Sequence, residues 1–307
     1  MEYKKIAIAG LGALGMIYAD ALEKVPGVTI YGLVDEGRKK RYEKDGRIFN
    51  GARKDYEYIT PDRADVKADL IIVTTKSAGL GSALEEMGNV IKDDTVIISF
   101  MNGISSERIL SERFGREHVL GAVYLGHPGQ NVNGKVEHDG SFKSFIGELD
   151  GPARSERVTD LEKLFLGAGM NITIPDNINY NLWSKFMMLV AFNQPTVLYD
   201  SDWGPYTQIP GAMDLPDHLL AEVKAVADKI GIPDTQKMLD DNITFMKKSP
   251  TGTVPSIYQD FIEKRPMEVD ILSGEVVRLG EQYGVDTPYN RTVADILTVL
   301  NGKIAQG

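Results

Sequence analysis

The chain has 307 residues, about twice the length of a typical single domain, so two domains are expected. Its composition, 42% hydrophobic and 25% charged, is that of a globular protein and excludes a disordered or fibrous chain. The net charge of −10 arises from 34 basic and 44 acidic residues without a long basic run. This balance argues against nucleic acid or an anionic membrane as a partner.

Several residue types and segments that define other protein classes are missing from the sequence. The chain has no cysteine, which excludes disulfides, thiolate metal sites and cysteine nucleophiles. The four histidines show no metal-ligand spacing, so we expect no metal and interpret them as structural: His118, His127, His138 and His218. No stretch of 18 apolar residues and no signal peptide is found. A cytoplasmic protein is therefore predicted.

The first half alternates short apolar runs with stretches of helical periodicity. The run Ile6–Ala9 is followed by a glycine-rich turn and then by an apolar-periodic stretch from Met16 to Lys24. Short continuous apolar runs are typical of parallel strands that helices cover on both faces. Alternation over about 120 residues predicts a Rossmann-type, doubly wound α/β sheet. Further strands are predicted at 28–34, 70–74 and 95–100, and further helices at 78–90 and 105–114.

The pattern changes in the middle of the chain. Residues 135–148 alternate and contain Asp139-Gly140, which predicts an antiparallel hairpin that completes the sheet. A helix at 156–166 and a short strand at 172–174 follow. Beyond them the chain reads as helical, with the clearest helices at 178–198, 215–230, 235–247 and 267–283. We expect a dinucleotide-binding domain at 1–175 and an all-helical substrate and catalytic domain at 176–307.

The turn after the first strand has the spacing Gly-x-Gly-x-x-Gly. In a strand–turn–helix context, such glycines allow a tight turn, close approach of a pyrophosphate and tight packing of the helix on the strand. The helix N-terminus adds free N–H groups and a partial positive charge for phosphate. The residues predicted to bind a dinucleotide here are Gly10, Leu11, Gly12, Ala13, Leu14 and Gly15.

The end of the second strand carries conflicting signals about the cofactor. Asp35 lies 20 residues beyond Gly15, where a carboxylate binds the ribose hydroxyls of NAD(H) and repels the 2′-phosphate of NADP(H). The basic run at residues 38–41 follows immediately and offers cations to a 2′-phosphate, or else forms a solvated helix surface. The residues alone leave this choice open.

Segments of the second half, with the glycine turn, carry a family resemblance. The chain resembles the ketopantoate reductase family (2-dehydropantoate 2-reductase) along essentially its whole length. The matching segments are Met101-Asn102-Gly103, Val136-x-His138-x-Gly140, Asn177-Ile178, Trp183-x-Lys185, Asn193, Ser256 and Glu268-Val269-Asp270-x-x-x-Gly274. The resemblance implies a two-domain reductase with its active site in the cleft between the domains. It also implies NADP(H) as cofactor, with NAD(H) possible because of Asp35.

The catalytic pair implied by the resemblance is Lys185 and Glu268. Lys185 stands among apolar residues, where partial desolvation would lower its pKa toward the range useful for proton donation to an alkoxide. A lysine that snorkels from a buried helix is the structural alternative. Glu268 is expected to hold the lysine or its water, and also to contact the cofactor. As the first residue of a predicted helix, it suits a helix N-terminus equally well.

The same resemblance assigns the binding residues. Ser256 binds the substrate carboxylate, although the position also fits a capping box. Asn102 lies at the C-terminal end of a strand, where ligands bind in open α/β sheets, and is expected to contact both substrate and cofactor. Lys76, after the strand at 70–74, is assigned to the cofactor. Asn181 and Asn193 are expected to bind substrate from one stripe of the helix that carries Lys185.

Two positions depart from the family pattern, since Leu189 and Trp203 stand where the family often has polar residues. The resemblance nevertheless implies reduction of ketopantoate to pantoate with NADPH, in pantothenate and coenzyme A biosynthesis. The alternative enzyme is an NADH-dependent reductase of other branched 2-oxo acids. The alternative outside the enzymes is a dinucleotide-binding sensor without catalytic activity. The presence of all four polar residues expected in the active site argues against it: Lys185, Asn102, Ser256 and Glu268. A homodimer is possible.

Overall fold

The computed structural model describes residues 2–63, 65–126, 129–132 and 135–306, and the chain forms two compact units. The sheet unit comprises Met1–Met101 and Ser106–Ile178, and the helical unit comprises Asn102–Ser105 and Asn179–Gly307. The single domain boundary predicted near Pro175 places residues 102–105 in the first domain, whereas in the structure they belong to the helical unit. His127, interpreted above as structural, lies outside the described residues.

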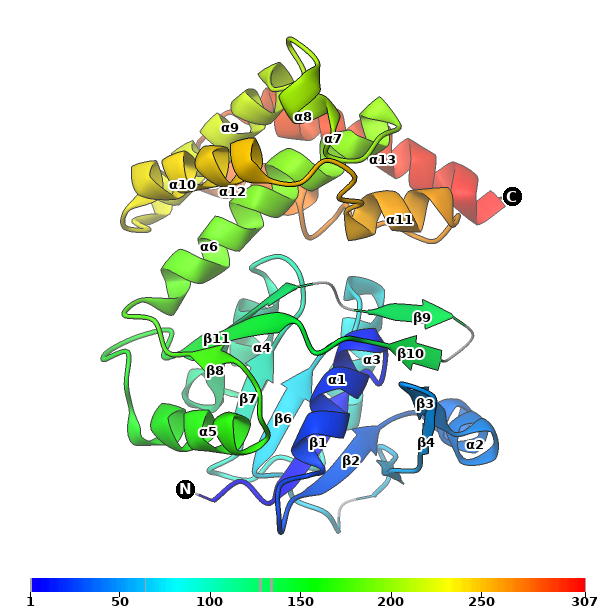
Figure 1. The fold of residues 1–307 in the computed structure, drawn as a ribbon. Coiled ribbons are helices and arrows are strands. Elements are labelled where there is room, and N and C mark those ends of the chain that lie inside the picture. Colours follow the sequence, from blue (N-terminus) through cyan, green and yellow to red (C-terminus); the bar gives the residue numbers. More distant parts are fainter. Residues whose placement is uncertain (1, 64, 127–128, 133–134, 307) are drawn as a thin grey trace. The chain divides into compact units, whose positions relative to one another are not determined.

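The sheet unit is built on an eight-stranded sheet with the order β12-β11-β8-β7-β6-β1-β2-β5 (Figure 1). Its central strands are parallel: β1 (Lys5–Ala9), β2 (Thr29–Leu33), β6 (Leu70–Val73), β7 (Val96–Ser99) and β8 (Val119–Gly126). Ile6, Ala7 and Ile8 are 0% exposed, as expected for a strand covered on both faces. The edge strands are β5 (Glu57–Ile59) and β12 (Ile172–Thr173), and β11 (Phe142–Gly147) lies between β12 and β8.

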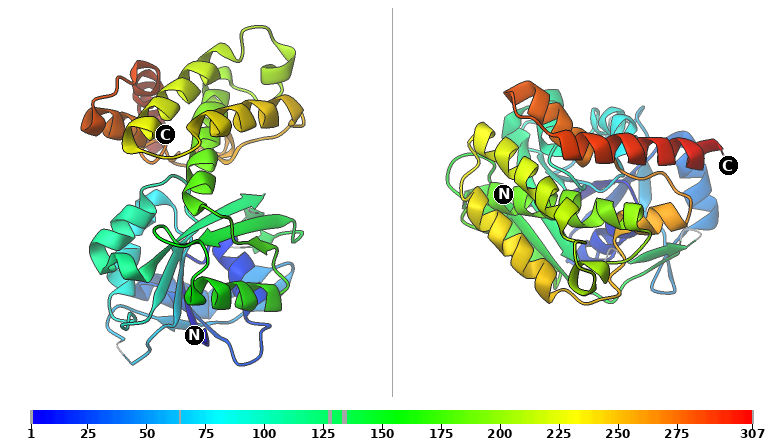
Figure 2. Two further views of the ribbon diagram at one scale, coloured as in Figure 1. Left: turned by 90° about the vertical axis from the view of Figure 1, so that its left-hand side faces the viewer. Right: turned by 90° about the horizontal axis from the view of Figure 1, so that it is seen from above.

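Helices cover both faces of this sheet, which confirms the predicted fold class. In Figure 1, α1 (Ala13–Leu22) and α5 (Glu156–Gly167) lie in front of the strands, and α3 (Leu80–Met87) and α4 (Ser106–Phe114) lie behind them. The left view of Figure 2 separates the two helical layers. The helix α2 (Glu36–Asp45) follows β2, and the 3₁₀ turn η1 (Ser77–Gly79) precedes α3.

The predicted hairpin at residues 135–148 is wrong, because its two halves belong to different sheets. The strand β10 (Lys135–Glu137) pairs with β9 (Gln130–Val132) and, in parallel, with β3 (Arg47–Phe49), which also pairs with β4 (Ala52–Lys54). By contrast, β11 pairs with β8. Two hydrogen bonds between Asn50 and the backbone of His138 fix the small sheet. Such pairing across 88 residues leaves no local signal.

The helical unit confirms an all-helical second half but divides it differently. It contains α6 (Ile178–Met188), the π-helix η3 (Leu189–Asn193), α7 (Gln194–Tyr199), α8 (Pro205–Gln208), α9 (Asp214–Ile230), α10 (Thr235–Lys248), α11 (Ser256–Ile262), α12 (Ser273–Tyr283) and α13 (Pro288–Gln306). The continuous helix predicted at 178–198 is thus interrupted by η3. Within the described residues, no helix combines the length and apolar character that a membrane span requires.

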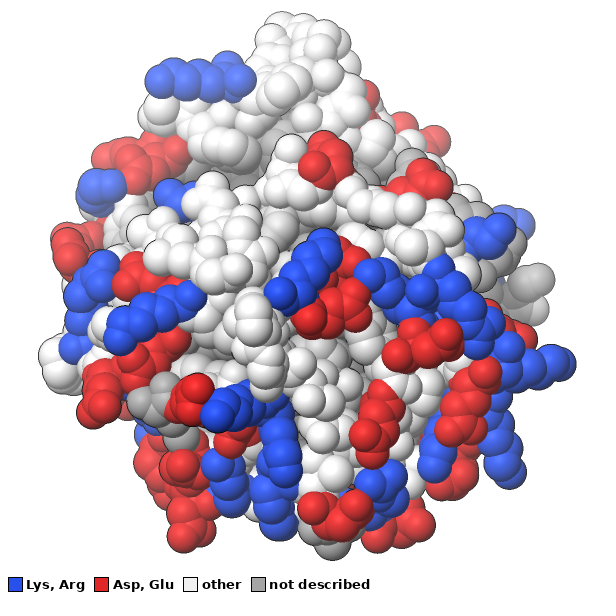
Figure 3. All heavy atoms as spheres, turned by 60° about the horizontal axis from the view of Figure 1, so that its bottom comes forward, with Lys and Arg blue, Asp and Glu red and all other residues white. Residues whose placement is uncertain are grey.

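Charged side chains of both signs alternate over the face seen in Figure 3 instead of forming one basic field. Exposed charged side chains of the described residues form ion pairs, such as Arg108 with Glu112 and Arg116 with Asp150. Because an exposed ion pair contributes at most about 1 kcal/mol, these pairs are a property of a solvated surface and not a main source of stability.

Candidate active site

The glycine-rich turn between β1 and α1 uses its three glycines in different ways. Gly10 has φ +101°, and a Cβ there would lie 2.8 Å from the backbone nitrogen of Thr75. A Cβ on Gly15 would lie 2.1 Å from the carbonyl oxygen of Gly10, so the helix packs directly on the turn. A Cβ on Gly12 would meet nothing within 4 Å. The first and third glycines therefore serve the fold, and the second leaves an open space.

The start of α1 faces this turn with unsatisfied backbone donors. The first helical bond runs from the N–H of Met16 to the carbonyl of Gly12, and no side chain of the described residues caps the helix. The N–H groups of Ala13 and Leu14 therefore precede the helical ladder and can bind an anion. With the open space at Gly12, the turn fits the pyrophosphate of a dinucleotide.

Sequence reasoning missed a cation at this turn. Arg47 of β3 is 7% exposed and donates to the carbonyl oxygen of Leu11 at 2.6 Å. Its guanidinium also lies over the Tyr42 ring, 4.9 Å from the centroid. Arg47 therefore fixes the backbone of the turn from the small sheet. Only pairing across the fold brings β3 to this place, so the sequence carried no signal for it.

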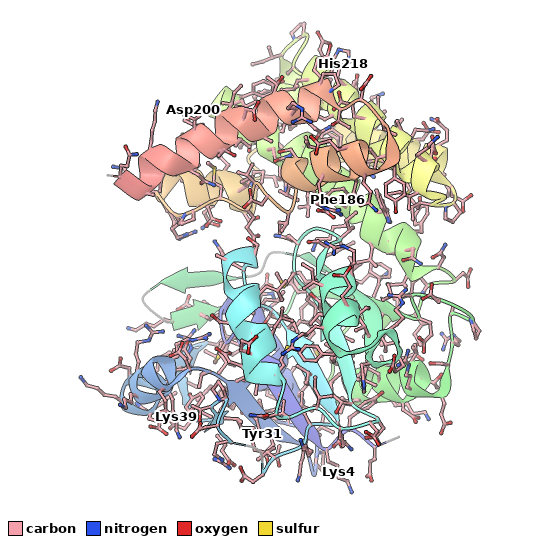
Figure 4. All side chains as sticks on the ribbon, turned by 180° about the vertical axis from the view of Figure 1, so that it is seen from behind. Lys4, Tyr31, Lys39, Phe186, Asp200 and His218 are labelled. Carbon is pink, nitrogen blue, oxygen red and sulfur yellow. The ribbon has the colours of Figure 1, made fainter. Side chains whose placement is uncertain are left out.

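At the end of β2, Asp35 is both exposed and paired. Its carboxylate caps α2 by accepting from the N–H of Arg38 at 2.7 Å, and it accepts from Arg38 Nε at 2.7 Å. These two contacts lower the pKa of Asp35. Arg38 is thus turned toward Asp35, whereas Lys39, labelled in Figure 4, lies farther along α2. Lys76, which is also predicted to bind the cofactor, is exposed and precedes η1.

The predicted proton donor, Lys185, lies on α6 and is half-buried. Its neighbours Trp183, Phe186 and Met187 are 7%, 1% and 0% exposed, and the Trp183 and Phe186 rings pack edge to face. Phe186 is labelled in Figure 4. Asn181 lies one turn earlier on the same helix and is also half-buried. Lys185 therefore belongs to a largely apolar helix and not to a solvated face.

The predicted stripe of four residues along one helix is only partly correct, because η3 lies within it. Residues of a π-helix turn less about the axis than those of an α-helix, so Asn193, at the end of η3, does not continue the line of Asn181 and Lys185. Asn193 is 6% exposed, and its Oδ1 has no hydrogen-bond partner among the described residues. A buried acceptor without a partner is costly, which suits a role in ligand binding. Single-turn π segments are frequent at functional sites.

Asn102 and Glu268, two of the predicted site residues, are in direct contact. Asn102 Nδ2 donates to Glu268 Oε2 at 3.2 Å, across 166 residues of sequence. The prediction that Glu268 begins a helix is wrong. It lies in a segment without regular secondary structure, where the N–H of Val269 donates to the carbonyl of Met267. The helix α12 begins only at Ser273, whose hydroxyl and N–H donate to buried Gln194 Oε1. Glu268 therefore does not stabilise a helix N-terminus.

Gly103 explains how residue 102 reaches this segment. It has φ +86°, and a Cβ there would lie 2.8 Å from the carbonyl oxygen of Ile271. We expect Gly103→Ala to lower the free energy of unfolding by roughly 1–3 kcal/mol, since it combines backbone strain with a clash against backbone. Urea unfolding measures the loss. Gly302→Ala on α13 is the control, because its Cβ would meet nothing within 4 Å. An equal effect of the two changes would contradict the packing described here.

The capping box predicted at Ser256 is wrong. Pro255 is the N-cap of α11, Ser256 is the first helical residue, and no described side chain caps this helix. Pro255 leaves the helix start without a side-chain acceptor. Ser256 is exposed, so its hydroxyl is available to a ligand.

Hydrogen bonds connect Trp203 with the segment before Ser256 and, through Tyr206, with the residue before Asn193. The backbone N–H of Trp203 donates to the carbonyl of Thr253, three residues before Ser256. The backbone carbonyl of Trp203 accepts from the backbone N–H of Tyr206. The Tyr206 hydroxyl in turn donates to the carbonyl of Phe192, next to Asn193, at 2.7 Å. Trp203 is 8% exposed, and its Nε1 has no hydrogen-bond partner among the described residues. The unit thus contains a buried donor and a buried acceptor that each lack a hydrogen-bond partner among the described residues.

No described group of three or more histidine, aspartate or glutamate side chains is placed to hold a metal ion. His118 and His138 make structural contacts: His118 Nδ1 lies 2.7 Å from the carbonyl of Thr95, and His138 Nε2 lies 3.3 Å from the Tyr124 hydroxyl.

Two family models match the chain. One, described as ketopantoate reductase PanE/ApbA, covers residues 6–151, and the other, described as its C-terminal part, covers residues 177–301. The chain belongs to the ketopantoate reductase family. This confirms the resemblance seen in the sequence and makes the protein an NAD(P)-dependent oxidoreductase that acts on a small molecule.

Individual relatives of this family are distant in sequence. The chain is 26% identical to a 2-dehydropantoate 2-reductase of Archaeoglobus fulgidus over 305 residues, which covers 97% of this chain and 98% of the relative. It is 24% identical to the uncharacterized oxidoreductase YkpB of Bacillus subtilis over 295 residues, covering 94% and 96%. At this distance, family membership fixes the type of reaction but not the substrate.

Solved structures of other proteins share the fold of this chain. D-mandelate dehydrogenase with NADH and anilino(oxo)acetate has a TM-score of 0.87 at 24% identity. The dimeric ketopantoate reductase of Staphylococcus aureus has a TM-score of 0.79 at 21% identity. Both comparisons cover 98% of this chain and 99% of the other.

Proposed function

We propose that the protein reduces a 2-oxo acid to the corresponding 2-hydroxy acid with a reduced nicotinamide cofactor. The observation that carries this proposal is the contact between Asn102 and Glu268 in the same unit as the half-buried Lys185. A polar pair and a lysine on an apolar helix suit the protonation of an alkoxide, which a dinucleotide sensor would not need.

In this proposal, each polar side chain has a separate task. Bound nicotinamide supplies the hydride to the ketone carbon. The Lys185 ammonium polarises the ketone oxygen and donates its proton to it as charge develops. Glu268, held by Asn102, orients Lys185 or a water between them. Ser256 donates its hydroxyl hydrogen to the substrate carboxylate, and the buried Asn193 Oδ1 accepts from the substrate or its water.

The charges at the end of β2 support NAD(H) as the cofactor, in place of the NADP(H) expected from the family. Asp35 presents a carboxylate of lowered pKa where the ribose hydroxyls would bind, and the nearest cation of the basic run, Arg38, is already paired with it. A 2′-phosphate at this place would be repelled by Asp35. A solved structure of the same fold contains NADH.

Titration of the protein with NADH and NADPH by nucleotide fluorescence tests this choice. We expect NADH to bind at least about tenfold more tightly. Asp35→Ala should weaken NADH binding and reduce the difference, because it removes the ribose acceptor and the repelling charge. Tighter binding of NADPH by the wild-type protein would contradict the proposal.

We infer that the substrate is a 2-oxo acid with a branched apolar side chain. Leu189, which replaces a frequent polar residue of the family, is 5% exposed and lies in the apolar core of the helical unit. The second candidate is ketopantoate, whose distal hydroxyl would need hydrogen-bond partners. Asn193 Oδ1 and Trp203 Nε1 favour it, since each is buried without a partner among the described residues and a hydroxyl can pair with either an acceptor or a donor.

The two candidates differ by a large and measurable factor. A site built to bond a hydroxyl rejects the analogue without it by about 10⁴-fold, whereas an apolar pocket discriminates far less. We expect kcat/KM for 2-oxoisovalerate or 2-oxoisocaproate to exceed that for ketopantoate. A ketopantoate preference that Trp203→Phe removes, with turnover of the unhydroxylated acids unchanged, would establish ketopantoate reduction instead. Phenylalanine keeps an aromatic ring at the position that packs against Phe245, and it removes the indole N–H together with one of the two fused rings.

A further inference from the structure

A buried carboxylate in the sheet unit has no part in the reaction described above. Glu86 lies near the end of α3 and is 3% exposed. Its Oε1 accepts from Arg38 Nη2, and its Oε2 has no partner among the described residues. Burial raises the pKa of Glu86, while the guanidinium of Arg38 opposes that rise. A buried carboxylate is stable as an ion only when a cation is held close to it, so Glu86 depends on Arg38.

Arg38 is shared between two carboxylates from different elements. Its Nε donates to Asp35 Oδ2 at 2.7 Å, while Nη2 donates to Glu86. Its side chain is only 28% exposed, compared with 55% for Asp35. The three groups together carry one net negative charge. The guanidinium therefore has little capacity left for a further anion. This is so although Arg38 is the first basic residue after β2, at the end of which the ribose is proposed to bind.

We propose that Glu86 is a positioning residue for cofactor selection, which holds Arg38 against Asp35 and away from a 2′-phosphate. The inference rests on the dinucleotide site proposed above. Without Glu86, Arg38 would keep one carboxylate partner and gain freedom to pair with phosphate, for which a guanidinium has a suitable fork of donors. With Glu86 present, the Arg38 side chain stays between Glu86 and Asp35, and the Asp35 carboxylate keeps one orientation toward the ribose hydroxyls. The basic run thus starts with an arginine that does not recruit phosphate.

The test is Glu86→Gln, which keeps the shape of the side chain and removes its charge. Affinities for NADH and NADPH are measured by nucleotide fluorescence, and those for ADP-ribose and 2′-phospho-ADP-ribose by calorimetry. We expect the dissociation constant for the 2′-phosphorylated ligands to fall by about three- to tenfold, since one opposing charge is removed near a partly exposed site. Affinity for NADH and ADP-ribose should change less than about twofold.

Two controls separate this effect from a general change of charge. Glu85→Gln removes the same charge from the exposed neighbouring position on α3 and should leave both affinities unchanged. In an Arg38→Ala background, Glu86→Gln should no longer improve binding of the 2′-phosphorylated ligands, because the group that it releases is absent. A Glu86→Leu variant serves the same purpose if the glutamine variant does not fold, since an apolar side chain suits a buried position.

Three results can be distinguished. If Glu86→Gln or Glu86→Leu selectively tightens 2′-phosphorylated ligands and Arg38→Ala cancels the gain, the proposal holds. If the wild-type protein binds the nucleotides but neither Glu86 variant changes their ratio, the role of Glu86 is overturned while the dinucleotide site stands. If the wild-type protein binds none of the four ligands, the proposed function itself fails.

Discussion

Lys185→Ala should lower kcat by roughly 10²- to 10⁴-fold, while the affinity for the nicotinamide cofactor changes little. The alkoxide formed by hydride transfer needs a proton, and Lys185 is the half-buried ammonium on the apolar helix α6. Alanine removes both the proton donor and the charge that polarises the ketone. The glycine turn, which belongs to the other unit, keeps its geometry. Steady-state turnover with a saturating 2-oxo acid, combined with a nucleotide titration, measures the two effects separately.

The matched control is Lys229→Ala, which removes an exposed lysine from the last turn of α9. We expect it to have nearly normal turnover. If the two variants have similar turnover numbers, Lys185 is not the acid. A Lys185→Ala variant that loses nucleotide affinity and turnover together would instead indicate a structural role for the lysine.

Gly12→Ala should weaken dinucleotide binding by roughly 10- to 100-fold without a loss of stability, which corresponds to about 1.4–2.8 kcal/mol of binding energy. The added Cβ would meet no protein atom within 4 Å and Gly12 has φ −79°, so the folded protein accepts it. The same methyl group fills the space proposed for the pyrophosphate beside the free N–H groups of α1. Nucleotide titration and thermal unfolding of the variant provide the two readouts.

Two other glycines complete this comparison. Gly81→Ala on α3 also adds a Cβ that meets nothing within 4 Å. It should lower neither the affinity for the dinucleotide nor the stability of the fold. Gly15→Ala should destabilise the sheet unit itself, since its Cβ would lie 2.1 Å from the carbonyl oxygen of Gly10. If Gly12→Ala binds the cofactor as tightly as Gly81→Ala does, the pyrophosphate does not lie at the turn.

The parts of the fold that could be predicted are those with local signals. The runs that became β1, β6 and β7 are continuously apolar because helices cover both faces of the sheet, and the glycine turn stands where β1 meets α1. The small sheet could not be predicted, because β3 and β10 pair across a long sequence separation. The π-helix η3 was also missed, since an apolar stretch gives the same periodicity signal whether or not one turn is wider.

The candidate site shows the same division. Asn102, Lys185 and Glu268 were singled out by motif, but the local settings predicted for Glu268 and Ser256 were wrong, because helix starts depend on weak capping signals. Arg47 and Glu86 were not singled out at all. Each acts through a partner from another element, Leu11 and Arg38 respectively, and a sequence does not show which charged residues become buried together.

The measurement that tests the central claim most directly is the stoichiometry of a single turnover. The protein is mixed with a limiting amount of reduced nicotinamide cofactor and an excess of a branched 2-oxo acid, and the oxidised cofactor and the 2-hydroxy acid are quantified. The account predicts one molecule of 2-hydroxy acid for each cofactor oxidised, and a strongly slowed reaction with Lys185→Ala. Tight cofactor binding without oxidation by ketopantoate or any branched 2-oxo acid would contradict it and would indicate a dinucleotide sensor.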